Sequence, residues 1–221
     1  MIIVVEGASA AGKTTWCRGI PREQVLFEGE PAANLSPLDA NDRLPPDALA
    51  VAEYWANENA RRWSTAREIS ERCGWVVCDA DPFKLHYSWT LWVTGLSSLE
   101  YWQGSLKFSR RLFAEERLGL PDLVFFADIS VDTLRRQKAA DLTRTRSRHE
   151  IHMRISPALK RWYLAMAALD PTRVEFQLPV NGLEPRHLQL GRRAGGRGAA
   201  LFDRFMAELE NASEISTSGN R

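Results

Sequence analysis

Cysteine is scarce in this chain and forms no recognisable pattern. Cys17, Cys73 and Cys78 are the three cysteines among 221 residues, and no two of them form a C-x-x-C pair. Disulfide scaffolds need paired cysteines, and cysteine zinc sites need closely spaced ones. The sequence therefore excludes both and predicts reduced thiols in the core of a cytoplasmic protein.

An excess of charge of one sign is also missing. Lys plus Arg number 29 and Asp plus Glu number 28, which gives a formal net charge of +1. General attraction to nucleic acid or to a membrane surface needs a basic excess, so neither partner is expected. No apolar run approaches the length of a membrane-spanning helix. Residues 1–5 already resemble a buried strand, which leaves no room for a signal peptide.

Short apolar runs alternate with helical patterns along the chain. Buried strands are predicted at residues 2–5, 24–28, 75–78, 123–129 and 174–178. This alternation predicts an α/β fold, a three-layer sandwich around a mostly parallel five-stranded sheet. The apolar fraction of 44% is ample for one core. We expect a single domain over residues 1–211 and a flexible tail at 212–221.

Capping residues bound the two longest predicted helices. Asp47 is placed to cap a helix that runs to residue 73, and Gly74 is placed to end it. Ser97 and Glu100 have capping-box spacing at the start of the second helix, which residues 119–121 would stop. Later helices are predicted after residue 130, at about 150–168 and at about 199–209.

The strongest motif is a glycine loop directly after the first strand. Residues 7–14 fit G-x-x-x-x-G-K-[ST], between a strand and a helix. Glycines let backbone amides turn toward phosphates, and the following helix adds its positive end. We predict that ATP and Mg²⁺ bind here, with Lys13 catalytic at the phosphates and Thr14 a metal ligand. The predicted nucleotide-binding residues of the loop are Gly7, Ala10, Ala11, Gly12, Lys13, Thr14 and Thr15.

A phosphate loop does not define a reaction, since ATPases and GTPase switches share it. Beyond the loop, the order of features resembles the nucleoside and nucleotide kinases, in particular the thymidylate kinase and deoxynucleoside kinase group. The matching segments are Val-Val-Glu-Gly at 4–7, Gly-Glu-Pro at 29–31 and the strand region 121–130. The resemblance covers most of the chain and implies a P-loop kinase fold with an arginine-rich lid at about 141–150.

Three arginines occupy the position of that lid. A guanidinium group pairs with two phosphate oxygens at once and can close over the charge that develops during transfer. The expected roles are catalytic for Arg144 and Arg148 and nucleotide-binding for Arg146. The alternative is a solvated helix end with pairs such as Arg146 with Glu150.

Carboxylates follow two of the predicted strands, at the edge where open α/β sheets bind ligands. Asp79 can hold Mg²⁺ or accept a proton from an attacking hydroxyl, so we predict a catalytic and a metal role for it. Glu30 has the same claim, and in the deoxynucleoside kinases the matching glutamate is the general base. Glu30 and Asp81 are also predicted to contact the acceptor. The alternative is a helix cap or turn residue, and Asp81 before Pro82 is a good turn former.

Two arginines that the resemblance implies are absent. Thymidylate kinases typically carry one before the Glu-Pro and one after the aspartate, where both hold the acceptor's phosphate. This chain has Gly29 and Ala80 there. Unless Lys84, Arg110 or Arg111 replaces them, a phosphate acceptor is poorly neutralised. The absences favour an uncharged acceptor with a hydroxyl group.

Aromatic residues follow the second carboxylate. An aromatic pocket for the acceptor can be walled by Phe83, His86, Tyr87, Trp89 and Trp92. Of these, Phe83, Tyr87 and Trp89 are predicted to bind the acceptor, as is Lys84. The alternative is a helix that buries its apolar face, which Trp89 also suits.

Three functions stay open at this point. The favoured one is an ATP-dependent kinase that phosphorylates a hydroxyl of a nucleoside-like or natural-product small molecule. The second is a nucleoside monophosphate kinase, which needs a replacement phosphate clamp. The third is a nucleotide-dependent switch without acceptor chemistry. A homodimer is left open.

Overall fold

A computed structural model describes residues 1–28, 47–140, 149–190 and 198–218. Its centre is a five-stranded sheet in the order β2-β3-β1-β4-β5, in which every neighbouring pair is parallel. The predicted α/β fold around a parallel sheet is thus confirmed. The strands are β1 (Ile2–Gly7), β2 (Val25–Leu26), β3 (Val76–Asp79), β4 (Leu123–Ala127) and β5 (Val174–Glu175).

The sheet register brings the site residues to one edge. The central strands are buried on both faces, as their β-branched and aromatic sequences predict. Val5 lies opposite Asp79, and Gly7 lies opposite Ala127. The carboxyl ends of β3, β1 and β4 therefore lie side by side, at the end of the sheet where the glycine loop begins.

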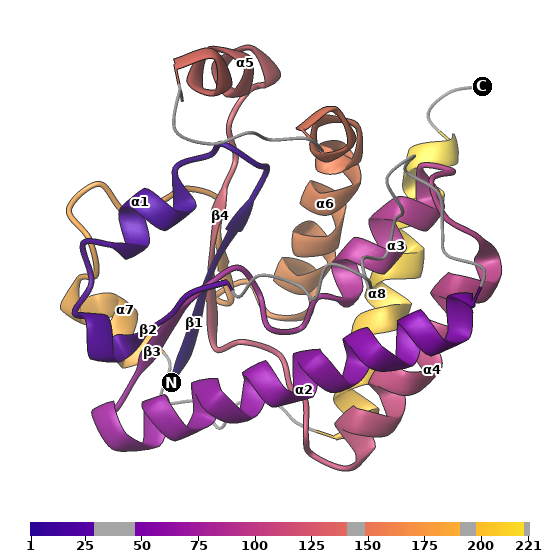
Figure 1. Ribbon diagram of the computed structural model, residues 1–221, viewed down its shortest axis with the longest axis horizontal. Helices are drawn as coiled ribbons and strands as arrows, with labels where there is room; N and C mark the ends of the chain where they lie inside the picture. The colour runs from indigo at the N-terminus through magenta and orange to yellow at the C-terminus, as the bar shows by residue number, and fades with distance from the viewer. Residues whose placement is uncertain (29–46, 141–148, 191–197, 219–221) are drawn as a thin grey trace.

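Helices cover both faces of the sheet, which gives the predicted three layers (Figure 1). One face packs Cys17 and Leu188 against Val5 and Phe125. The opposite face packs against the larger aromatic cluster that includes Trp162. The helices are α1 (Lys13–Cys17), α2 (Ala48–Cys73), α3 (Leu85–Val93), α4 (Leu99–Ala114), α5 (Val131–Ala140), α6 (His149–Leu169), α7 (Pro185–Leu190) and α8 (Ala199–Ser218), with a 3-10 turn, η1, at Arg22–Gln24.

The two long predicted helices differ in how well their ends were predicted. The Asp47 carboxylate accepts a hydrogen bond from Ala50 N at 2.9 Å and Gly74 ends α2 with φ 83°, as predicted. The cap of α4 is Ser98, whose hydroxyl accepts from Tyr101 N at 3.2 Å, so the predicted cap at Ser97 is wrong by one residue. This start places Tyr101 and Trp102 on the buried face.

Two other boundaries need correction. Helix α4 ends at Ala114 rather than near residues 119–121. Helix α8 continues to Ser218, well past the predicted end at about 209. Its inner face supplies Phe202, Phe205 and Leu209 to the core.

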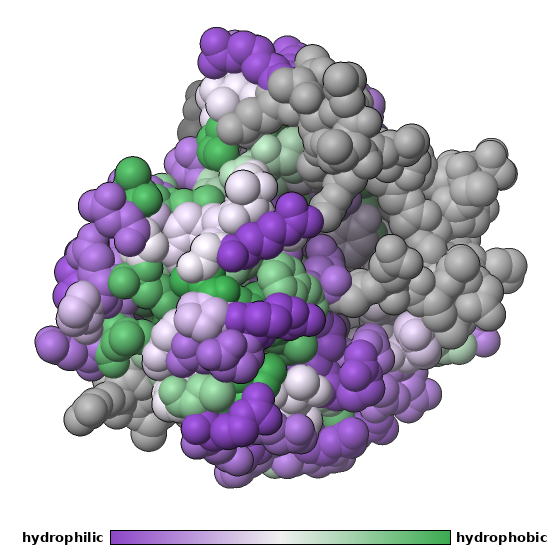
Figure 2. Space-filling model, turned by 60° about the vertical axis from the view of Figure 1, so that its left-hand side comes forward, coloured by the Kyte–Doolittle hydropathy of each residue, from purple (hydrophilic) through white to green (hydrophobic). Residues whose placement is uncertain are grey.

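On the face shown in Figure 2, apolar patches are separated by hydrophilic side chains. Four large hydrophobic side chains are exposed among the residues that the structure describes, namely Leu49, Leu99, Leu164 and Val180. Within the same residues, no helix combines the length and the hydropathy that a membrane span requires. Neither observation tests the homodimer, which stays a prediction.

Candidate active site

The glycine loop connects β1 to α1 and holds its lysine folded back over the backbone. Lys13 Nζ donates to the carbonyl oxygens of Gly7 at 2.7 Å and of Ala8 at 3.0 Å. Gly12 is the N-cap of α1 with φ 82°, and Ala10 also has a left-handed φ of 73°. Such a conformation costs an alanine about 1–2 kcal/mol, and strain of this kind gathers at functional loops.

Thr14 and Asp79 meet at the first turn of α1. The Thr14 hydroxyl donates a hydrogen bond to the Asp79 carboxylate. Burial raises the pKa of Asp79, and the Thr14 hydrogen bond together with Lys13 opposes that rise. A hydroxyl and a carboxylate beside a phosphate loop are hard oxygen ligands of the kind that Mg²⁺ takes. The two predicted metal ligands are therefore adjacent and fit the ion.

No group of three or more His, Cys, Asp or Glu side chains that could hold a metal exists in the described part of the chain. A magnesium ion here would therefore take its remaining ligands from phosphate and water. That pattern is the usual one for Mg²⁺ in phosphoryl-transfer sites.

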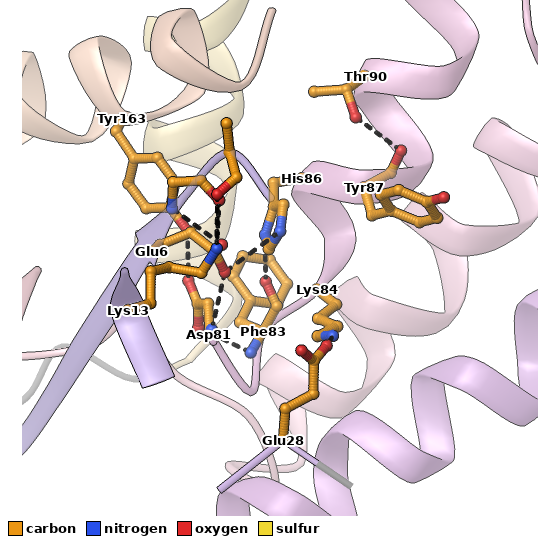
Figure 3. A network of polar contacts seen from close by, with 12 residues as sticks. Glu6, Lys13, Glu28, Asp81, Phe83, Lys84, His86, Tyr87, Thr90 and Tyr163 are labelled. Carbon is orange, nitrogen blue, oxygen red and sulfur yellow. Dashed lines mark hydrogen bonds and ion pairs between the residues drawn. The ribbon is translucent and has the colours of Figure 1, made fainter. Parts of the chain in front are cut away.

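An ion pair joins the ends of β2 and α3. Lys84 Nζ, on the N-cap residue of α3, donates to a carboxylate oxygen of Glu28 just after β2 (Figure 3). Burial raises the pKa of Glu28, but the ion pair and hydrogen bond with Lys84 outweigh it and lower the pKa to about 2. Glu28 is a site residue that sequence reasoning missed. Its signal was a charge at the carboxyl end of a weak strand.

Asp81, two residues beyond Asp79, has no exposed surface. Its Oδ1 accepts from Phe83 N at 2.8 Å and its Oδ2 accepts from the Tyr163 hydroxyl at 3.1 Å. Burial, together with the nearby Glu6, raises the pKa of Asp81 to about 7. Both oxygens of Asp81 are thus bonded within the protein. This arrangement favours the alternative that Asp81 is a structural turn residue over contact with the acceptor.

Glu6 is the second residue that sequence reasoning missed. It is 5% exposed, and its two oxygens accept from Gly7 N and from Asp81 N, both at 3.0 Å. His86 Nε2 lies 3.7 Å from Glu6 Oε2. Burial raises the pKa of Glu6, but the charges of His86 and Lys13 prevail and lower it. The available signal was an acidic residue at the end of an apolar strand.

The predicted aromatic wall divides into two parts. Phe83 is fully buried, with its ring centroid 4.9 Å from that of Phe113, and Trp89 is 3% exposed against Trp162. The buried-helix alternative therefore describes Trp89, which α3 turns into the core, and Phe83 is buried in the segment just before that helix. Tyr87 is half-buried and stacks on His152 with centroids 6.0 Å apart and planes at 26°.

His152 is a third residue that sequence reasoning missed. It lies in the first turns of α6, which pack on α3 through Ile151, Ile155 and Leu91. Burial lowers the pKa of His152 to about 4, and the charge of Lys13 adds to this effect. The charges of Glu28 and Lys84 act on the ring as well. The imidazole of His152 is therefore neutral near pH 7 and feels the charges of Lys13, Glu28 and Lys84.

The remaining predicted residues fall into two groups. Glu30 and the three lid arginines, Arg144, Arg146 and Arg148, lie outside the described residues. Arg110 forms two hydrogen bonds with Asp203, at 2.8 and 2.7 Å, on the exposed surface.

Comparison with known proteins supports the fold. No protein-family model matches the chain, and no curated protein matches it either. Solved structures of deoxyadenosine kinase from M. mycoides do match. The structure with products dCMP and a flexible dCDP bound has a TM-score of 0.56 and 12% identity, and the match covers 96% of this chain and 100% of that chain.

Two further structures of the same enzyme give the same result. The structure with bound dCTP has a TM-score of 0.57 at 12% identity and the same coverage. The structure with bound dATP has a TM-score of 0.57 at 13% identity and covers 86% of this chain and 96% of that chain. The chain therefore has the fold of a P-loop deoxynucleoside kinase, as the sequence resemblance implied.

Proposed function

We propose that this protein is an ATP-dependent, Mg²⁺-assisted kinase that transfers the γ-phosphoryl group to a hydroxyl of a nucleoside-like or natural-product small molecule. The observation that carries the choice of acceptor is the ion pair between Lys84 and Glu28. The phosphate loop, with Thr14 and Asp79 beside it, supports the choice of donor.

The donor end uses the loop and its lysine. Lys13 now bonds two loop carbonyls, and a bound triphosphate would offer it stronger acceptors in the same place. Thr14 and Asp79 would hold Mg²⁺, which supplies neutralisation of the charge on the phosphate oxygens when bound. Lys13 would stay with those oxygens as charge develops during transfer.

The acceptor end favours a neutral molecule. Lys84 was one of the predicted replacements for the missing arginines, but its charge is already matched by Glu28. His152 is neutral near pH 7, because burial and Lys13 lower its pKa to about 4. A phosphate acceptor would bring about two negative charges to this place, where the charge of Lys84 is already matched by Glu28.

The choice of base follows from the same charges. Lys84 keeps the pKa of Glu28 near 2, which makes Glu28 a weak proton acceptor. Burial raises the pKa of Asp79 and of Asp81, but both Asp81 oxygens are bonded inside the protein, so Asp79 is the better-placed base of the two. Glu30 keeps the base role that the family resemblance implies as an alternative.

The structural neighbours are consistent with a nucleoside-like acceptor. They are deoxyadenosine kinases whose structures hold dCMP, dCDP, dCTP or dATP. At 12–13% identity this similarity concerns the fold, so the acceptor has to be identified by experiment.

The test is a panel of acceptors with ATP and Mg²⁺, followed by ADP release. Matched pairs such as deoxyadenosine with dAMP and deoxycytidine with dCMP differ only in the phosphate. We expect turnover of hydroxyl compounds and none of monophosphates. Turnover of monophosphates alone would support a nucleotide kinase instead. Slow hydrolysis with no transfer to any acceptor would support a nucleotide-dependent switch.

A further inference from the structure

A chain of buried hydrogen bonds runs from the phosphate loop to helix α6 (Figure 3). Gly7 N and Asp81 N both donate to the Glu6 carboxylate, and the Tyr163 hydroxyl donates to Asp81. We infer that Glu6 is a positioning residue for phosphoryl transfer, and that Asp81 and Tyr163 extend its hold from the phosphate loop to α6. The inference rests on the proposed function, because it assumes that the loop binds ATP.

Glu6 is suited to this role because it accepts two backbone amides from different segments. Gly7 N begins the phosphate loop, and Asp81 N lies in the connection that follows Asp79. One carboxylate thus fixes the loop relative to the segment that carries Asp79. A carboxylate has two accepting oxygens, whereas a glutamine side chain has one accepting oxygen and an amide NH₂ group that only donates.

The segment beyond Asp79 needs such support. Ala80 has φ 70°, a left-handed conformation that alanine adopts at a cost. Its amide donates to Val5 O at 3.1 Å, and the next amide, that of Asp81, donates to Glu6. This turn lets Asp79 reach Thr14 while Asp81 reaches Tyr163. The two bonds therefore hold a strained turn between the two carboxylates.

Tyr163 anchors the far end of the chain. The centroid of its ring lies 5.2 Å from that of Phe126 and 6.0 Å from that of His86, and the side chain is fully buried. Tyr163→Phe keeps this packing and removes only the hydroxyl bond to Asp81. A matched control is Tyr101→Phe, because Tyr101 is also buried but its hydroxyl bonds Ser88 and Ser105 in another cluster.

The experiment compares the Glu6→Gln, Tyr163→Phe and Tyr101→Phe variants with the wild-type protein at a temperature well below unfolding. Amide hydrogen exchange at Gly7 and Asp81 is measured by NMR without ligand, and ATP affinity is measured by calorimetry. In Glu6→Gln we expect one of the two amides to exchange about tenfold faster and ATP to bind about tenfold more weakly. In Tyr163→Phe we expect about threefold changes in the same direction.

The control decides between positioning and general stability. Tyr101→Phe should lower the unfolding temperature without changing either readout. Wild-type exchange at both amides in Glu6→Gln and Tyr163→Phe would overturn the inference, and so would equal effects in Tyr101→Phe. If Glu6→Gln does not fold, Tyr163→Phe still tests the chain. Absence of ATP binding by the wild-type protein would contradict the proposed function, while the exchange rates still test the hydrogen-bond chain itself.

Discussion

Replacing Gly7 with alanine would push a methyl group into the backbone of β4. A Cβ built at Gly7 lies 2.9 Å from Ala127 O, 3.0 Å from Ala127 Cβ and 3.2 Å from Ala127 N. These atoms belong to a central strand that is hydrogen-bonded on both sides, so they cannot give way as a flexible side chain would. The backbone at Gly7 also has φ 141°, which side chains rarely allow.

Gly12 provides the comparison, because it has φ 82° and no heavy atom within 4 Å of an added Cβ. Gly12→Ala carries only the backbone strain, about 1 kcal/mol. Gly7→Ala adds overpacking of about 1–3 kcal/mol to a similar strain, about 3 kcal/mol in total. The two variants should therefore differ by about 2 kcal/mol in the free energy of unfolding.

Urea denaturation measures this difference directly. Each variant is compared with the wild-type protein, and the dependence of the free energy of unfolding on urea concentration should be the same in all three. For a chain of this size, about 2 kcal/mol corresponds to roughly 4–8 °C in unfolding temperature. Equal stability of the two variants, or a less stable Gly12→Ala, would refute the close packing of Gly7 on β4. The register of β1 against β4 would then need revision.

Three further predictions concern the site itself. Lys13→Ala should abolish turnover yet change the free energy of unfolding by less than about 1 kcal/mol, since its bonds are to loop carbonyls; kinetics with wild-type rates would refute the phosphate-loop role. Asp79→Asn should slow transfer far more than it weakens ATP binding, and unchanged transfer would give Asp79 a structural role only. His152 has a pKa of about 4 against an ordinary 6.5, so the unfolded chain binds more protons between these values and stability falls as pH drops from about 6.5 to 4. His152→Asn should remove up to about 3 kcal/mol of that loss in urea denaturation series at several pH values, whereas an unchanged dependence of stability on pH would contradict the lowered pKa of this half-buried ring.

Local signals made much of the fold predictable. A cap such as Asp47 and a terminator such as Gly74 act within one turn of the helix they bound. The glycine loop likewise needs only its own residues and the elements on either side. Short buried strands next to such markers could therefore be placed in order, and their alternation with helices predicted the parallel sheet.

The start of α4 shows where local signals fail. Ser97 and Ser98 are both good caps, and the capping-box spacing favoured the first. Ser98 is the cap in the structure because that start turns Tyr101 and Trp102 into the core. Tertiary burial thus decided between two locally equivalent positions. Tertiary burial also explains why Phe83 and Trp89 lie in the core rather than in the wall of an acceptor pocket.

The missed site residues depend on contacts between distant segments. Tyr163 and Asp81 are 82 positions apart, and Lys84 and Glu28 are 56 apart. Their pairing follows from strand register and from the way α6 packs on α3, which no local pattern encodes. His152 had no motif around it for the same reason. Such residues can be identified as part of the site only from the three-dimensional structure.

The most direct test of the account is ADP formation by the wild-type protein with ATP, Mg²⁺ and matched nucleoside and nucleoside monophosphate acceptors, with Lys13→Ala as the blank. The account predicts transfer to a hydroxyl of an uncharged acceptor, because Glu28 already neutralises Lys84 and His152 is neutral. Transfer to the phosphate of a monophosphate, with no turnover of its nucleoside, would contradict it.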